Sequence, residues 1–126
     1  MIQRILGIDY GSTRIGLAIS DETGRIAFPH GTVANLREVC AVIQRQEIQR
    51  IVIGVPVPFG GGASAQSRAA SAFAVKLKRT VQLPVVLENE VLTSKLARRG
   101  TQPRSVDASA AALILQSYLD RVNAYG

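Results

Sequence analysis

The stretch RILGIDYGSTRIGLAISD, residues 4–21, decides the fold of this chain. It contains two short apolar runs, residues 4–11 and 15–21, around the tight turn GSTR. Both runs have the length and apolar character of buried strands, so the pair is predicted to form a β-hairpin. The main competing arrangement, a flavodoxin-like fold, needs a helix between its first two strands. The GSTR spacer is too short to supply one.

Downstream of this hairpin, strand-like and helix-like patterns alternate. Residues 50–56 are β-branched and apolar on both faces, as a central parallel strand would be. The helix expected over 64–80 has Ala69, Phe73 and Leu77 as its apolar stripe. The other expected elements are a strand within 25–33, a helix over 36–47 capped by Asn35, a strand over 83–89, a short helix over 91–99 and a helix over 105–121 capped by Ser105.

The order of these elements predicts an α/β protein with a five-stranded mixed sheet flanked by helices. The RNase H-like fold has this order. With 126 residues, the chain has the size of one domain, so residues 1–126 are expected to form a single domain. The hydrophobic share of 47% is sufficient for a packed core.

Charge and cysteine content indicate the partner and the compartment. The formal net charge is +6, which favours a polyanionic partner. No apolar run is long enough to cross a bilayer, so no membrane partner is expected. The single Cys40 excludes an internal disulfide, and no signal peptide is evident at the N-terminus. These features predict a cytoplasmic protein.

Asp9 is the first candidate functional residue. Strand alternation places Ile5, Gly7 and Asp9 on one face of a strand that is apolar on both sides. A carboxylate there is costly to bury unless a cation or hydrogen bonds compensate it. Asp9 also lies near the carboxyl end of the strand, where open α/β sheets bind ligands. A structural role, capping the turn through Ser12 or Thr13, is the alternative.

Two more acidic segments come from other predicted elements. Asp107 falls in the first turn of the expected 105–121 helix, whose alanine content would let it pack closely on the sheet. The helix dipole alone also explains an acid at that position. Glu88 and Glu90 lie on one face at the end of the expected 83–89 strand, with a pair of surface acids as the alternative. Carboxylates from three elements suit a phosphodiesterase site that binds magnesium or manganese.

Four segments carry a specific resemblance to a known family. They are DYGSTRIGLAISD (9–21), IVIGVPVPFGG (51–61), ENEVLTSKLA (88–97) and VDASAAALILQSYLD (106–120). In order and spacing they resemble the motifs of the YqgF/RuvX family, and the match covers nearly the whole chain. That family is related to Holliday-junction resolvases, and its members are named as nucleases of pre-16S ribosomal RNA.

The resemblance implies a nuclease whose catalytic, metal-binding carboxylates are Asp9, Glu90 and Asp107, with Mn²⁺ or Mg²⁺ as the cofactor. It also implies that Arg14 and Arg68 contact phosphate. The chain departs from the family pattern at Pro58, Asn89 and Val91, where the family usually has Asn, Asp and Arg. Four basic residues lie between Glu90 and Asp107: Lys95, Arg98, Arg99 and Arg104. Their position beside the expected site predicts contact with the nucleic-acid backbone, with a solvated helix end as the alternative.

Three functions follow as hypotheses. The first is hydrolysis of phosphodiester bonds in RNA, in processing of the 5′ end of pre-16S rRNA. The second is a structure-selective DNA nuclease that acts on Holliday junctions in recombination and repair. The third is a weakly catalytic RNA-binding factor in ribosome assembly, which Asn89 and Val91 favour and the intact carboxylates oppose. D-x-G-S-T also opens the phosphate hairpin of actin-like ATPases, but this chain is too short for the two domains they need.

Overall fold

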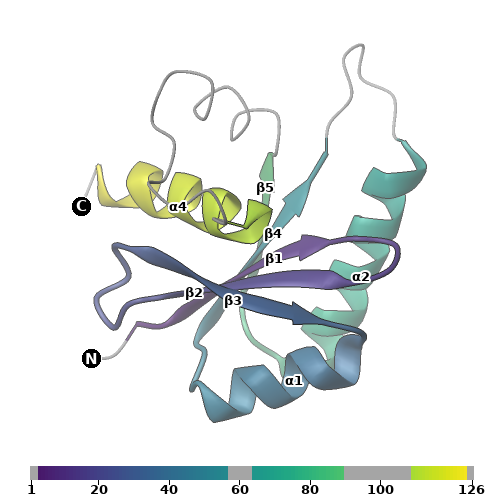
Figure 1. The fold of residues 1–126 in the computed structure, drawn as a ribbon, viewed down its shortest axis with the longest axis horizontal. Helices are drawn as coiled ribbons and strands as arrows, with labels where there is room; N and C mark the ends of the chain where they lie inside the picture. Colours follow the sequence, from purple (N-terminus) through teal and green to yellow (C-terminus); the bar gives the residue numbers. More distant parts are fainter. Residues whose placement is uncertain (1–2, 57–63, 90–108, 125–126) are drawn as a thin grey trace.

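The computed structural model describes residues 3–56, 64–89 and 109–124. Within these residues the strands form one mixed sheet in the order β3-β2-β1-β4-β5. The middle strand β1 pairs antiparallel with β2 and parallel with β4, so the predicted five-stranded mixed sheet is confirmed (Figure 1). The strands are β1 (Ile5–Tyr10), β2 (Ile15–Ser20), β3 (Ala27–Val33), β4 (Arg50–Val55) and β5 (Val85–Asn89).

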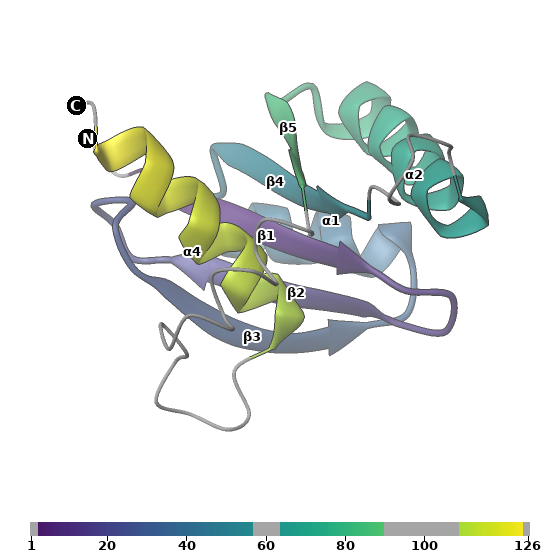
Figure 2. The same cartoon turned by 90° about the horizontal axis from the view of Figure 1, so that it is seen from above.

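Helices cover both faces of the sheet. Helix α1 (Leu36–Arg45) and helix α2 (Ala65–Val81) pack on one face, and helix α4 (Ala110–Asn123) lies across the other (Figures 1 and 2). Asn35 caps α1 as predicted, since its side-chain oxygen accepts a hydrogen bond from the Glu38 amide at 3.0 Å. No helix in the described ranges is long and apolar enough to cross a membrane.

The start of α4 corrects the predicted cap. Ser109, and not Ser105, is the N-cap, because its hydroxyl accepts a hydrogen bond from the Ala112 amide at 3.1 Å. The helix therefore begins at Ala110, and Asp107 precedes the cap in the sequence. Asp107 and the short helix predicted over 91–99 both lie outside the described residues.

The face under α1 and α2 holds a core of large aliphatic and aromatic side chains. Phe73 and Leu77 of α2 are buried in it as predicted, but Ala69 is exposed. Ala70 and Ala74 are buried as well, so the buried stripe passes through Ala70 in place of Ala69 in the first half of α2. The fully buried side chains on this face are Leu6, Ile8, Leu17, Val39, Ile51, Ile53 and Leu77.

Small residues lie where α4 crosses β1 and β2 on the other face of the sheet. A Cβ atom at Gly7 would lie 2.7 Å from Leu115 Cβ and 3.0 Å from the Ala111 carbonyl oxygen. These distances are too short for any side chain, so glycine is required where α4 meets β1. Ala18, Ala111 and other small residues continue the contact. The prediction that the alanine-rich helix packs closely on the sheet is confirmed.

Candidate functional site

Asp9 lies at the carboxyl end of β1 between two glycines. It is in register with Gly16 on β2 and with Gly54 on β4. Gly54 is in turn in register with Glu88 on β5. Residues in register on neighbouring strands project to the same face, so Asp9 and Glu88 both project toward the α4 side. The placement of Asp9 at the end of a central strand agrees with the sequence prediction.

The two glycines leave space beside the Asp9 carboxylate. A Cβ atom at Gly16 would lie 3.7 Å from Asp9 Cβ and 3.9 Å from Ala111 Cβ. The described residues provide no hydrogen bond to the Asp9 carboxylate, and neither Ser12 nor Thr13 forms a turn cap with it. As far as the described residues go, Asp9 is therefore a half-buried carboxylate whose two oxygens accept no hydrogen bond.

Asp21, at the turn between β2 and β3, shows what a structural aspartate looks like in this protein. Its carboxylate accepts hydrogen bonds from the Arg25 amide at 2.8 Å and the Ile26 amide at 2.9 Å. The Thr23 hydroxyl also donates to it. This hydroxyl, followed by the backbone amides, holds the pKa of Asp21 well below its usual range. Asp9 has none of these donors, which separates it from a turn-forming residue.

Glu88 is buried, so the surface-acid alternative is wrong for this residue. Its side chain is only 3% exposed and forms an ion pair with Arg121 of α4. The Arg121 Nη1 atom donates to both carboxylate oxygens, at 2.8 Å to Oε2. The hydrogen bond to Glu88 raises the pKa of Arg121, which stays protonated in any case. The pair ties β5 to α4.

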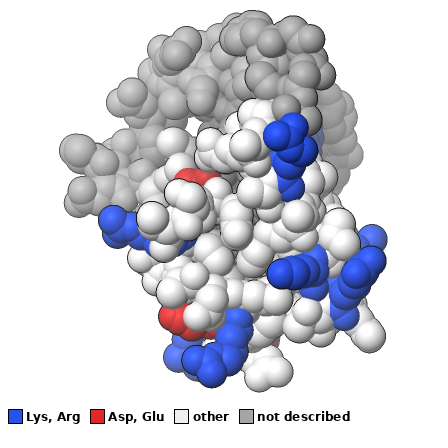
Figure 3. All heavy atoms as spheres, turned by 90° about the vertical axis from the view of Figure 1, so that its right-hand side faces the viewer, with Lys and Arg blue, Asp and Glu red and all other residues white. Residues whose placement is uncertain are grey.

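Arg14 and Arg68 lie toward the same end of the sheet as Asp9. Arg14 is exposed on the turn between β1 and β2, and Arg68 is exposed near the start of α2. Helix α2 contains basic residues and no acidic ones, and basic side chains dominate the face that includes it (Figure 3). The other predicted site residues lie outside the described ranges: Glu90, Lys95, Arg98, Arg99, Arg104 and Asp107.

With two of the three predicted carboxylates outside the described ranges, the described part contains no group of three His, Cys, Asp or Glu residues that could hold a metal ion. What the described part does provide is the central position of the site. Asp9 occupies it, with an open face toward α4 and with Glu88 one strand beyond Gly54. The roles of Glu90 and Asp107 remain predictions.

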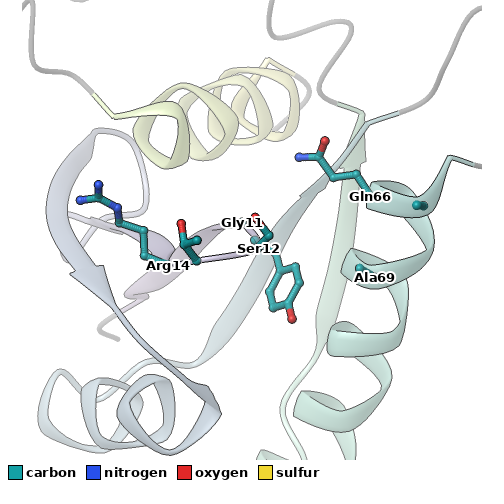
Figure 4. Close-up of a pocket in the computed structure, with 8 residues that line it drawn as sticks. Gly11, Ser12, Arg14, Gln66 and Ala69 are labelled. Atoms are coloured by element: carbon teal, nitrogen blue, oxygen red, sulfur yellow. The ribbon is translucent and has the colours of Figure 1, made fainter.

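Sequence reasoning missed a pocket of about 580 Å³ beside the turn between β1 and β2. The turn provides one wall and the first turns of α2 provide the other (Figure 4). Tyr10, next to Asp9, contributes an aromatic ring that stacks on Phe73 with ring centroids 4.6 Å apart. The one feature of the sequence that could have indicated this pocket is the aromatic residue directly after Asp9. The pocket is lined by Tyr10, Gly11, Ser12, Thr13, Arg14, Ala65, Gln66 and Ala69.

Comparison with known sequences identifies relatives along almost the full length of the chain. A protein of Rickettsia typhi named as a pre-16S rRNA nuclease is 34% identical over 136 aligned positions, covering 96% of this chain and 87% of the relative. A protein of Anaeromyxobacter sp. strain Fw109-5 with the same name is 39% identical, covering 93% of this chain and 96% of the relative.

Comparison with solved structures agrees on the fold. RuvC of Thermus thermophilus in complex with a Holliday junction substrate superposes with a TM-score of 0.66 and 16% sequence identity. The match covers 96% of both chains. A second structure of Thermus thermophilus RuvC gives a TM-score of 0.60. RuvC has an RNase H-like fold, so the fold expected from the element order is confirmed.

The family comparison completes the assignment. The family model described as "RuvX: Holliday junction resolvase" matches residues 3–121, which includes every strand and nearly all of α4. The match spans both the β1 motif with Asp9 and the segment that leads into α4. The chain therefore belongs to the RuvX family.

Proposed function

We propose that this protein is a divalent-metal-dependent nuclease that hydrolyses phosphodiester bonds in RNA. Its task would be processing of the 5′ end of pre-16S rRNA in the cytoplasm. The names of the Rickettsia and Anaeromyxobacter relatives support the substrate, and the family description supports the nuclease class. The net charge of +6 is suited to a polyanionic substrate.

The observation that carries this proposal is the environment of Asp9. Its carboxylate lies at the end of the central strand and receives no hydrogen bond from the described residues. Glycines flank it on both neighbouring strands. A half-buried carboxylate without donors is unfavourable in a purely structural role, whereas a bound cation compensates its charge. Asp21 of the same protein shows the difference, because its carboxylate accepts hydrogen bonds from backbone amides and needs no cation.

The residues fit a hard divalent cation. Asp9 offers only oxygen donors, and Mg²⁺ and Mn²⁺ prefer carboxylate oxygens. In this proposal Asp9, Glu90 and Asp107 hold the ion. When bound, it would activate water and stabilise the charge that develops on the phosphate. Arg14, on the turn directly after β1, would orient the substrate by contacting a phosphate next to the site. Arg68, Lys95, Arg98, Arg99 and Arg104 would neutralise further phosphates along the strand.

A DNA junction is the second candidate substrate. The overall similarity to RuvC in its junction complex and the description of the RuvX family as Holliday junction resolvases both favour it. At 16% identity the RuvC match shows the fold alone, so the substrate has to be decided by experiment. Resolution of a junction needs two coordinated cuts, and hence two sites related by symmetry. The RNA proposal makes no such demand.

The test is a cleavage assay with purified protein on single-stranded RNA and on a four-way DNA junction. Each substrate is incubated with Mn²⁺, with Mg²⁺ or with EDTA. RNA cleavage is expected with either metal and not with EDTA. Asp9→Asn is expected to lower the rate by about 100-fold or more, since it removes a metal ligand. Without metal its melting temperature is expected to match or exceed that of the wild type, because a half-buried negative charge without a compensating cation is removed.

Asp21→Asn is the matched control, since it makes the same change at the structural aspartate. It is expected to keep the cleavage rate at a temperature where both proteins are folded. An Asp9→Asn variant that melts well below the wild type, or still cuts at full rate, would show that Asp9 is structural. Symmetric nicks in the junction, together with intact RNA at equal enzyme, would replace RNA with DNA junctions as the substrate.

A further inference from the structure

The pocket beside the turn between β1 and β2 adjoins the proposed catalytic site. Asp9 and Tyr10 are consecutive residues of β1, so their side chains point to opposite faces of the sheet. Asp9 faces α4, and Tyr10 faces α2, where its ring stacks on Phe73. A nucleic-acid strand that crosses the turn can therefore reach both Asp9 and the pocket. Only the end of β1 separates the Asp9 carboxylate from the pocket.

The chemistry of the pocket matches that of a nucleoside. The ring of Tyr10 and the methyl groups of Ala65 and Ala69 provide an apolar lining, and the stack on Phe73 fixes the tyrosine ring. Gln66 adds an amide that is both donor and acceptor, and Ser12 adds a hydroxyl. In Figure 4 the Gln66 side chain extends from α2 toward the turn, while the Arg14 side chain extends from the turn in the direction away from α2.

The polar groups that line the pocket are available to a ligand. Among the described contacts, the side chains of Ser12, Thr13 and Gln66 form no hydrogen bond, and all three are exposed. None of the described residues that line the pocket is acidic, so they do not repel a phosphate group. Arg14 lies on the turn that walls the pocket, and its side chain extends away from α2, so its positive charge lies beside the pocket and not inside it. These groups favour an anionic ligand with a flat ring and polar edges.

The size of the pocket favours a single unpaired nucleotide over a base pair. Its volume of about 580 Å³ is in the range of sites for small molecules and accommodates one nucleotide. The turn and α2 wall the pocket on two sides, so a base has to leave its stack and its pairing partner to enter. Recognition of RNA commonly works in this way, through splayed bases that stack on aromatic side chains.

We propose that this pocket binds one unpaired nucleotide of the substrate strand, next to the phosphate that is cut at Asp9. The proposal rests on the proposed nuclease function for its substrate. It adds that the protein prefers single-stranded or locally melted RNA over a continuous duplex. The base would stack on Tyr10, and Gln66 would hydrogen-bond to its edge.

Binding measurements in EDTA test the pocket separately from cleavage. The probe is a fluorescein-labelled single-stranded RNA 12-mer, and the same sequence in a blunt RNA duplex is the comparison. Ala69→Phe fills the pocket with a ring, and Ala72→Phe makes the same change at another exposed alanine of α2 that does not line the pocket. Ala69→Phe is expected to weaken single-strand binding about tenfold, the scale of one lost base stack. Ala72→Phe is expected to change it less than about twofold.

Gln66→Ala provides a second variant with little steric effect. It is expected to weaken single-strand binding about threefold and to leave duplex binding unchanged. Equal affinity of the wild type for single strand and duplex would overturn the proposal. So would wild-type affinity for the single strand in both Ala69→Phe and Gln66→Ala. If these variants weaken binding but no metal supports cleavage, the proposed nucleotide-binding pocket is supported and the proposed nuclease function is wrong. If cleavage is normal and binding is insensitive, the function holds and the pocket fails.

Discussion

The two faces of the sheet differ in the size of the side chains that cover them. Under α1 and α2, large residues such as Leu17, Ile53 and Phe73 fill a thick apolar core. Under α4, the small residues Gly7 and Ala18 lie beside the larger Ile5 and Val52, and at Gly7 the helix lies almost against the backbone of β1. The only polar residues buried on the sheet itself in the described ranges, Ser20 and Glu88, are also on the α4 side.

This difference separates stability from positioning. A large buried side chain removes more apolar surface from water, and the stabilisation grows with that area. A small residue contributes less, but it fixes how closely two backbones approach. The face under α1 and α2, called here the thick face, therefore contributes most to stability. The face under α4, called the thin face, holds α4 at a set distance from β1, the strand that contains Asp9. Variants on the two faces should have different consequences for stability and for cleavage.

The largest effect on stability is expected from Leu77→Ala on the thick face. Leu77 is fully buried, and its truncation leaves a cavity in the core. The free energy of unfolding, measured by urea denaturation, should fall by about 3 kcal/mol. The cleavage rate of the folded protein should stay within about twofold of the wild type, since Asp9 is on the other face of the sheet and Leu77 does not line the pocket beside α2.

Val75→Ala on the same helix is the matched control, because Val75 is 51% exposed. It should lower the free energy of unfolding by less than about 0.5 kcal/mol. If Leu77→Ala removed cleavage while the protein was still folded, the proposed separation of the two faces would be wrong.

A smaller loss of stability, combined with a loss of cleavage, is expected from Gly7→Ala on the thin face. The new methyl group would meet Leu115 Cβ at 2.7 Å, so α4 has to move. The free energy of unfolding should fall by about 2 kcal/mol. Cleavage by the folded protein should fall by about tenfold, because the segment that carries Asp107 leads directly into α4.

Gly16→Ala is the comparison for Gly7→Ala. Its methyl group would lie at ordinary contact distances, 3.7 Å from Asp9 Cβ and 3.9 Å from Ala111 Cβ. It should therefore cost less stability than Gly7→Ala, measured under the same conditions. Equal stability losses in the two variants would mean that the close approach at Gly7 is not what positions α4.

The smallest effect is expected from Arg121→Met, which removes the partner of the buried Glu88 on the thin face. An unpaired buried carboxylate is costly, but the Arg121 side chain is 47% exposed, so solvent screens the pair. The free energy of unfolding at pH 7 should fall by about 1 kcal/mol. Adding Glu88→Gln removes the uncompensated charge and should recover part of that loss. A double variant less stable than Arg121→Met would show that Glu88 has another stabilising partner.

Local pattern was sufficient to predict the strands and the placement of Asp9. The hairpin follows from two apolar runs around GSTR, and the face of the sheet on which Asp9 lies follows from alternation alone. The cap of α4 was not predictable in this way, because Ser105 and Ser109 both precede an alanine-rich run. Only the hydrogen bond from the Ala112 amide distinguishes them.

Features that depend on distant parts of the chain were missed for a physical reason. Glu88 is buried because Arg121, on another element, neutralises it. The pocket exists because the turn after β1 meets the start of α2, and neither segment shows this alone. The position of Asp9 could be predicted from the sequence because it depends only on the alternation of residues within β1. Glu88 and the pocket arise from contacts between elements that pattern analysis treats separately.

The packing of α4 on Gly7 has a consequence for the newly made protein. Helix α4 is the last described element, yet its main partner is β1, the first. While the chain is being synthesised, β1 to β5 leave the ribosome before α4 does. Until α4 docks, the Asp9 face of the sheet lacks the helix that covers it in the folded protein. We therefore expect a ribosome-bound chain to be inactive, so that activity begins only after residues near Leu115 have emerged.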